Sequence, residues 1–152
     1  MGRDVARVLI VIMTAITSLP LSVSSSLAAE CTETGTSGSD VIVGTPQADV
    51  LCGLSGNDFI RGVRGNDIIR GGTGADDLDG GPGADVVRGG RGRDSLIGGI
   101  GGDTLLGHRH ADSLNSVDGT TGNDTIDGGP GPDTCRVDDG DTVSNCESII
   151  RV

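Results

Sequence analysis

Aspartates recur at a fixed interval of nine residues, and their carboxylates are the groups in this chain best suited to chemistry. They stand at Asp40, Asp49, Asp58, Asp67, Asp76, Asp85, Asp94, Asp103 and Asp112. If one turn and one short strand use nine residues, a coil of two strands uses eighteen, and aspartates eighteen apart stack on one edge. Stacked carboxylates about 5 Å apart repel by roughly 3 kcal/mol at an effective dielectric near 20. Because the chain has no lysine, a divalent cation between successive turns is the simplest way to remove this repulsion.

Calcium is the cation that these residue types favour. Ca2+ takes six to eight oxygen ligands in flexible geometry, from carboxylates and backbone carbonyls, whereas Mg2+ requires a tighter octahedron. Apart from Cys52, the central repeats lack the sulfur and nitrogen ligands that transition metals prefer. We therefore expect roughly four or more ions, between the pairs Asp58/Asp76, Asp76/Asp94, Asp67/Asp85 and Asp85/Asp103. The expected ligands are these aspartates, the turn glycines Gly71, Gly74, Gly80, Gly83, Gly89 and Gly92, and, in less regular turns, Asp40, Asp49, Asp112, Asp124 and Asp133.

Very short strands must position these carboxylates. An apolar residue follows each aspartate by two positions, and glycine follows by four positions in every repeat but the last. Alternation along a strand points the apolar residue inward and its neighbours outward. The expected inward residues are Ile42, Leu51, Ile60, Ile69, Leu78, Val87, Leu96, Leu105, Leu114 and Ile126. This pattern predicts an all-β protein built as a parallel β-roll, a solenoid with two strands per coil. Since its core is thin for its length, we expect a largely unfolded chain that folds on binding Ca2+.

The turns themselves resemble a known family. The six-residue motifs that match it fully are GGTGAD (71–76), GGPGAD (80–85), GGRGRD (89–94), GGIGGD (98–103) and GGPGPD (128–133). They are similar to the hemolysin-type, or repeats-in-toxin (RTX), calcium-binding family, whose repeat is G-G-x-G-x-D-x-U-x. The resemblance covers residues 35–134. It implies a secreted parallel β-roll that binds Ca2+.

The repeat slips once. The step from Asp112 to Asp124 is twelve residues, so three residues are inserted between His108 and Thr121. We expect a bulged loop there, with His108 and His110 in it. Two histidines without a third ligand are weak support for a transition-metal site.

The first 29 residues predict a cleavable secretory signal peptide. Arg3 and Arg7 precede the apolar run at residues 8–12, and Ala28 or Ala29 would end the cleaved segment. The alternative, a membrane anchor, needs about 20 predominantly apolar residues. Pro20 and the serine-rich residues 22–26 interrupt this one too early. We therefore expect a secreted, extracellular protein without a membrane span.

Four cysteines flank the repeats. Residues 135–146 are expected to form two short strands with a hairpin turn at Asp139-Gly140. Four cysteines allow three pairings, and we favour the two that close local loops, Cys31–Cys52 and Cys135–Cys146. The predicted organisation is a signal peptide (1–29), a calcium-binding β-roll (30–134) and a disulfide-stapled cap (135–152).

Composition excludes several classes of function. The chain has 28 glycines, one phenylalanine, no tryptophan or tyrosine, and a net charge of −11. It therefore lacks the basic, aromatic surface that nucleic acid requires. Disorder fits such a composition, but a disordered chain has no reason to keep a nine-residue register.

No enzyme is predicted, because the sequence has neither an HExxH motif nor a serine with a usable histidine partner. Calcium binding coupled to folding is the expected activity. The alternative is a calcium-dependent extracellular adhesion module that binds a cell-envelope polymer or a partner protein. Arg61, Arg64, Arg70, Arg88, Arg91 and Arg93 are candidate contacts for the alternative, although they also balance the charge of the aspartates.

Overall fold

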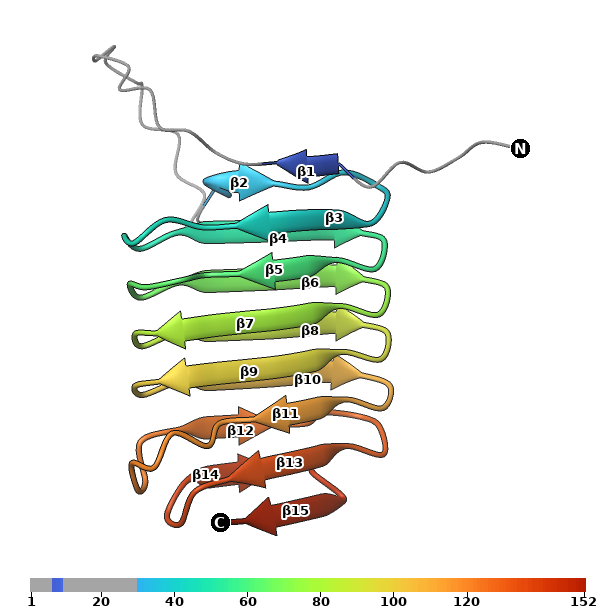
Figure 1. Ribbon diagram of the computed structural model, residues 1–152. Helices are drawn as coiled ribbons and strands as arrows, with labels where there is room; N and C mark the ends of the chain where they lie inside the picture. Colours follow the sequence, from blue (N-terminus) through green and yellow to red (C-terminus); the bar gives the residue numbers. More distant parts are fainter. Residues whose placement is uncertain (1–6, 10–29) are drawn as a thin grey trace.

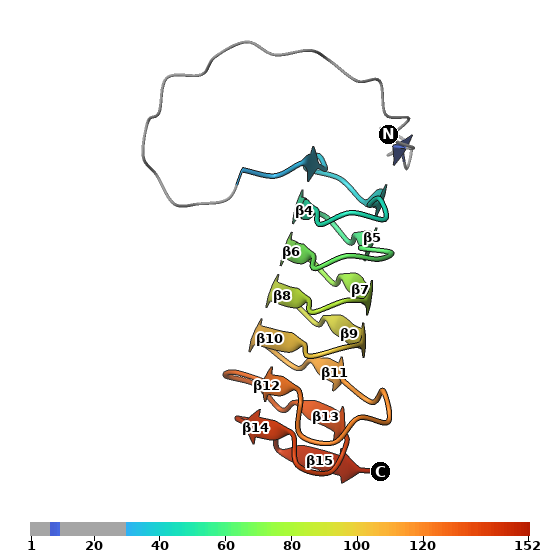
Figure 2. The same ribbon diagram turned by 90° about the vertical axis from the view of Figure 1, so that its left-hand side faces the viewer.

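Two parallel β-sheets stack into an elongated roll (Figure 1). The structure is a computed structural model that describes residues 7–9 and 30–152. The expected signal-peptide cleavage site lies outside the described residues. Figure 2 shows the strands of the two sheets as two columns along the roll. The described residues form no helix, and so none that could cross a membrane.

The odd-numbered strands form one sheet, called sheet A, and the even-numbered strands form the other, called sheet B. Sheet A contains β1 (Arg7–Leu9), β3 (Asp40–Val43), β5 (Phe59–Arg61), β7 (Asp77–Pro82), β9 (Ser95–Ile100), β11 (Ser113–Asn115), β13 (Thr134–Val137) and β15 (Ser148–Arg151). Sheet B contains β2 (Glu33–Thr34), β4 (Val50–Ser55), β6 (Ile68–Thr73), β8 (Val86–Arg91), β10 (Thr104–Arg109), β12 (Thr125–Asp127) and β14 (Thr142–Ser144). The chain alternates between the sheets, so each coil is one strand of each.

The register confirms the eighteen-residue coil. Leu51 pairs with Ile69, and Ile69 pairs with Val87 on the next strand. The ten residues expected to point inward are all buried, each with an exposed fraction of 2% or less. Cys135 continues their column after Leu114 and is also fully buried. The core is therefore a single line of apolar side chains from each sheet.

Several strands are longer than the expected three residues. β6 runs on through Gly71 and Gly72, because Gly72 still pairs with Leu54 on one side and Gly90 on the other. The first two glycines of a turn therefore belong to the sheet, and the corner of the coil is made by the residues after them.

The inserted residues lie in the later part of the expected stretch, after the histidines. The turn that carries His108 and His110 is regular: its residues accept and donate turn hydrogen bonds, as from His110 N to Pro130 O (3.0 Å). The two histidines take the positive φ values of the glycines they replace, 75° and 86°. The expectation that the two histidines lie in the bulged loop is therefore wrong, although the loop itself is present. The extra residues form the loop between β11 and β12, where Asp118 Oδ2 accepts a hydrogen bond from Gly101 N (3.0 Å).

The hairpin expected at Asp139-Gly140 is also wrong. β13 belongs to sheet A and pairs in parallel with β11, whereas β14 belongs to sheet B and pairs in parallel with β12. The tail therefore continues the solenoid by another coil. Both disulfides join the expected cysteines, Cys31–Cys52 and Cys135–Cys146.

Candidate metal centre

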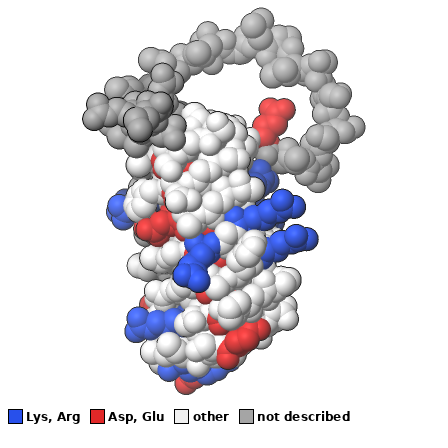
Figure 3. Space-filling view, turned by 90° about the vertical axis from the view of Figure 1, so that its right-hand side faces the viewer, with Lys and Arg blue, Asp and Glu red and all other residues white. Residues whose placement is uncertain are grey.

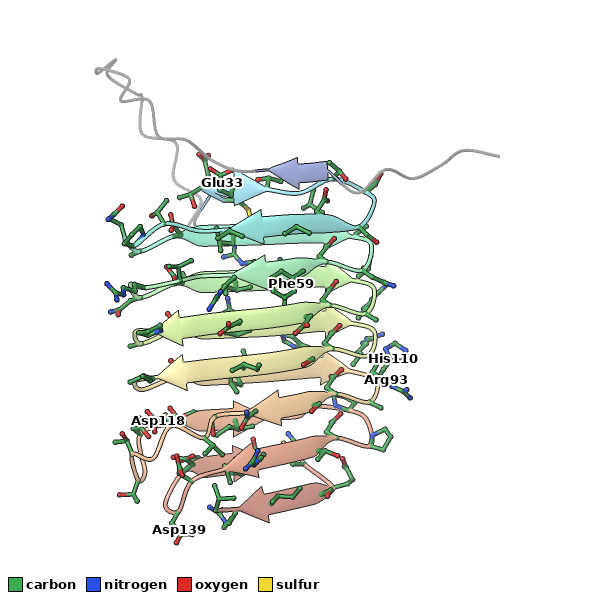
Figure 4. The ribbon with its side chains drawn as sticks, viewed as in Figure 1. Glu33, Phe59, Arg93, His110, Asp118 and Asp139 are labelled. Atoms are coloured by element: carbon green, nitrogen blue, oxygen red, sulfur yellow. A yellow bond between two sulfur atoms is a disulfide. The ribbon has the colours of Figure 1, made fainter. Side chains whose placement is uncertain are left out.

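The repeat aspartates are buried at the two turn edges of the roll. Every one from Asp40 to Asp112 has an exposed fraction of 8% or less, as do Asp124 and Asp133. Figure 4 shows oxygen-tipped side chains repeated one above another near the edge that carries Arg93 and His110. The glycine-rich turns therefore do not leave these carboxylates in solvent, which is where aspartates in turns ordinarily lie.

One oxygen of each carboxylate joins successive coils. Asp58 Oδ1 accepts a hydrogen bond from Asp40 N (2.9 Å), and Asp76 Oδ1 accepts one from Asp58 N (2.9 Å). The same contact repeats on the other edge, from Asp49 N to Asp67 Oδ1 (2.8 Å). Every repeat aspartate from Asp58 to Asp112 thus accepts a hydrogen bond from the backbone of the aspartate one coil earlier, which confirms that residues eighteen apart stack.

The other oxygen has no partner. Oδ2 is buried and makes no hydrogen bond in nine repeat aspartates: Asp58, Asp67, Asp76, Asp85, Asp94, Asp103, Asp112, Asp124 and Asp133. Burying a carboxylate oxygen without a hydrogen bond or a counter-charge is costly. A column of such atoms on each edge therefore calls for a ligand that supplies positive charge.

Asp40 and Asp49 differ from the others. Thr36 donates to Asp40 Oδ2 from its backbone N (2.6 Å) and its Oγ1 (2.9 Å). Thr45 does the same for Asp49, at 2.7 and 2.8 Å. These two carboxylates are satisfied by the chain itself, so they are weaker candidates for a cation than the central ones.

Burial raises the pKa of the stacked aspartates. The pKa of Asp85 and of Asp112 rises from 3.8 to about 7, and that of Asp58, Asp76 and Asp124 rises to about 6. Loss of solvent is the largest cause, and neighbouring carboxylates add to it, as Asp103 and Asp67 do for Asp85. In the metal-free fold these carboxyl groups therefore keep their protons to a higher pH than exposed aspartates do. A bound cation would instead favour the ionised carboxylates.

Backbone oxygens lie close to the unpartnered carboxylates. The carbonyl oxygen of Gly80 and Asp67 Oδ2 both lie next to the position that a Cβ on Gly62 would occupy. The carbonyl oxygen of Gly89 and Asp76 Oδ2 lie in the same way next to the Cβ position of Gly71. Gly71, Gly80 and Gly89, predicted as ligands, thus place their carbonyls beside a carboxylate.

The carbonyls of Gly74 and Gly83, which were also predicted as ligands, lie against a glycine of the next coil, Gly92 and Gly101 respectively. Neither these carbonyls nor that of Gly92 is among the acceptors of the backbone hydrogen bonds found in the described turns.

A family model for the RTX calcium-binding nonapeptide repeat matches five overlapping stretches, residues 34–69, 53–87, 70–105, 79–114 and 111–143. The chain belongs to the RTX calcium-binding repeat family. Neither the curated proteins nor the solved structures contain a match. RTX repeats typically form calcium-binding structural elements rather than catalytic ones, and membership therefore supports calcium as the ligand of this β-solenoid.

The donor set fits this metal. Carboxylate and carbonyl oxygens with little nitrogen or sulfur are what Ca2+ prefers. The described residues contain no group of three or more acidic, histidine or cysteine side chains placed to hold a metal. Backbone carbonyls beside the carboxylates, such as those of Gly71, Gly80 and Gly89, are further oxygens that the turns offer.

The RTX pattern extends further than the nine-residue spacing shows. Asp141 Oδ1 accepts from Asp124 N (3.3 Å), and Glu147 Oε2 accepts from Asp133 N (2.8 Å). These acids occupy the repeat position in the last coil, although they lie 17 and 14 residues after their partners. The spacing gave no indication of them, but an apolar residue still follows each by two positions, Val143 and Ile149.

Gly71→Ala is expected to destabilise the RTX roll. A Cβ at Gly71 would collide with Asp76 Oδ2 and lie 2.8 Å from the carbonyl of Gly89, where the backbone cannot yield. Such overpacking costs about 1–3 kcal/mol, to be measured by urea unfolding at saturating Ca2+. Gly38→Ala is the matched control, because the nearest atom to its Cβ would be Thr36 Oγ1 at 3.8 Å. Equal losses of unfolding free energy in the two variants would contradict the close packing described around Gly71.

Proposed function

We propose that this protein is a secreted calcium-binding protein whose β-roll folds by taking up Ca2+ between stacked turns. The observation that carries the proposal is the column of buried, unpartnered Oδ2 atoms on each turn edge. It rests also on the carbonyl oxygens beside them and on membership of the RTX family. No catalytic role is proposed.

Coupling between binding and folding follows from how the coils contact one another. The repeat carboxylates come together only when successive coils stack, so the unfolded chain has no equivalent site. A ligand that binds only the folded state at 100 times its dissociation constant stabilises it by about 2.7 kcal/mol per site. Several such sites would supply an amount comparable to the whole stability of an ordinary domain.

Secretion is supported by two features. Residues 1–29 have the composition of a signal peptide. The two disulfides suit an oxidising compartment outside the cytosol, where calcium-binding modules of low affinity are also common.

A calcium titration of the purified protein tests the function. Calorimetry is expected to give four or more ions per chain, while circular dichroism shows the β-sheet signal appearing cooperatively over the same calcium range. Magnesium at equal concentration is expected to give little of either. Uptake of at most one ion, in a chain already ordered in chelator, would overturn the proposal.

A further inference from the structure

Arginines gather on the outer face of sheet B, where β6, β8 and β10 end in the turns. Arg88 and Arg91 come from β8, and Arg109 comes from β10. The register places Arg91 directly beside Arg109, and Arg88 beside Arg70. Neighbouring strands lie about 4.8 Å apart, so two pairs of like charges face each other across the sheet.

Arg91, Arg93 and Arg109 are not neutralised by the residues that the structure describes. An ion pair joins Arg61 and Asp79 on sheet A at 3.4 Å. In the part of the chain that the structure describes, no ion pair involves Arg91, Arg93 or Arg109. Like charges directly opposite one another in a sheet are destabilising. The pairing of Arg91 with Arg109 therefore costs stability that no ion pair of the described residues offsets.

The repeat aspartates of this region are buried beneath the surface. Figure 3 looks onto the turn edge, where basic side chains project and acidic atoms show in smaller and larger areas beside them. The buried carboxylates are those of the repeat aspartates, while Arg91, Arg93 and Arg109 are exposed. An acidic protein thus presents a cationic surface at this place.

A trough lies between the arginines. A shallow hollow of about 400 Å³ is lined by Gly72, Thr73, Gly90, Arg91, His108 and Arg109. Its floor lacks side chains for a structural reason: a Cβ at Gly72 would collide with the carbonyl of Leu54, and one at Gly90 with the carbonyl of Gly72. Alternation along β6 and β8 puts Arg70 and Arg88 on the same outer face as these glycines.

A second hollow continues the cationic surface around the turn edge. It measures about 600 Å³ and is lined by Arg93 and His110 together with Ala75, Gly92, Ala111 and Pro132. Figure 4 shows Arg93 and His110 next to each other at this edge. The two hollows lie on the same coils, so a chain-like ligand could contact both.

We propose that this surface, the arginine trough, binds a linear phosphodiester polymer. A guanidinium binds a carboxylate or a phosphate in bidentate fashion. A carboxylate oxygen has two lone pairs in one plane, whereas each of the two non-bridging oxygens of a phosphodiester has three that are not confined to a plane. One phosphodiester can therefore accept hydrogen bonds from arginines on two neighbouring strands, as Arg91 and Arg109 are. No Phe, Tyr or Trp lies on β6, β8 or β10, and the imidazole of His108 is the only ring on these three strands, so they offer bases little to stack on.

The inference rests on the proposed function in one respect. The trough exists only when coils β6 to β10 are stacked, which we attribute to Ca2+. Bound Ca2+ also adds two positive charges per ion to a chain that, without its first 29 residues, has a formal charge of −12. Calcium loading would thus reduce the long-range repulsion of a polyanion.

The test uses a fluorescein-labelled abasic deoxyribose-phosphate oligomer as the probe, with anisotropy as the readout. The protein is held at one free calcium concentration at which circular dichroism shows the folded roll. Arg91→Gln/Arg109→Gln is expected to weaken binding about tenfold or more and to reduce the salt dependence, by about 0.7 in the log–log slope for each lost phosphate contact. Arg61→Gln/Arg64→Gln removes the same charge elsewhere and is expected to change the affinity less than about threefold.

Several outcomes would overturn the proposal. These are no binding by the folded protein, equal losses in the two double variants, or equal affinity for an oligogalacturonate of the same charge. Oligothymidylate binding about tenfold tighter than the abasic probe would show that bases are recognised, and would overturn it too. If the chain folds without Ca2+, the same comparison is made in chelator, so failure of the calcium proposal is seen separately. Arg91→Gln/Arg109→Gln is expected to be at least as stable as the wild type, because it removes a like-charge pair.

Discussion

In chelator at pH 8 the protein is expected to lose its β-sheet signal, and acidification towards pH 4 is expected to restore it without calcium. The folded-state pKa values of the stacked aspartates are raised, to about 7 for Asp85 and Asp112 and about 6 for Asp58 and Asp76, from an ordinary 3.8. The metal-free fold therefore binds more protons than the unfolded chain. Its stability is fully present below about pH 4 and is lost as the pH rises through 6 to 7.

Calcium is expected to reverse this dependence. Since Ca2+ binds ionised carboxylates, the loaded roll should be most stable near neutrality and should release its ions on acidification. Urea unfolding at pH 4, 6 and 8, in chelator and in Ca2+, gives both curves. Metal-free stability that is flat or increases from pH 4 to 8 would contradict the burial of unpartnered carboxylates.

Asp85→Asn is expected to change stability in opposite directions with and without calcium. Its amide oxygen can still accept the hydrogen bond that Asp67 N donates to Oδ1 (2.7 Å). The unpartnered Oδ2 becomes a neutral NH2 group, and the repulsion from Asp103 and Asp67 disappears. In chelator at pH 8 the variant should therefore be more stable than the wild type. In Ca2+ it should be less stable, by about 2.7 kcal/mol for each site emptied at 100 times its dissociation constant.

Asp77→Asn is the matched control. Asp77 follows Asp76 in the chain, but its side chain is exposed on the outer face of β7. The substitution removes one negative charge without touching the stacked carboxylates. It should leave calcium stoichiometry unchanged and alter stability by less than about 0.5 kcal/mol in either condition. Destabilisation of Asp85→Asn in both conditions would mean that Oδ2 does not face a cation.

The nine-residue spacing predicted the coil, the inward residues and the stacking of the aspartates because one period is one half-coil. Because side chains along a strand alternate between its two faces, the same spacing also predicts which of them point into the core, such as those of Leu78 and Val87. The strand lengths could not be predicted from this spacing. Gly72 and its equivalents pair within the sheet, although glycine in a sequence is typical of a turn. At Asp139-Gly140 the local sequence is typical of a hairpin, but the parallel neighbours β11 and β12 direct the two strands into different sheets.

The stacking of the aspartates was predicted, but the hydrogen-bond partners of each carboxylate were not. The satisfaction of Asp40 and Asp49 by Thr36 and Thr45 depends on where a hydroxyl falls within a folded turn, which spacing does not reveal. Asp141 and Glu147 were missed because irregular spacings of 17 and 14 residues conceal their place in the column. The calcium ligands and the signal peptide remain predictions.

The threonine-bonded aspartates of the first coil give the roll a direction of assembly. Each coil contacts only its neighbours, so folding in such an array spreads from a nucleus as a zipper does. Thr36 and Thr45 satisfy the carboxylates of Asp40 and Asp49, and the Cys31–Cys52 disulfide joins this coil to the strand before it. On the proposed function, we expect this coil to become ordered first and each ion then to extend order by one coil towards the carboxyl end. A substitution that prevents one middle coil from folding would halt this propagation at that coil. The coils on its amino-terminal side would then be folded and those on its carboxyl-terminal side unfolded.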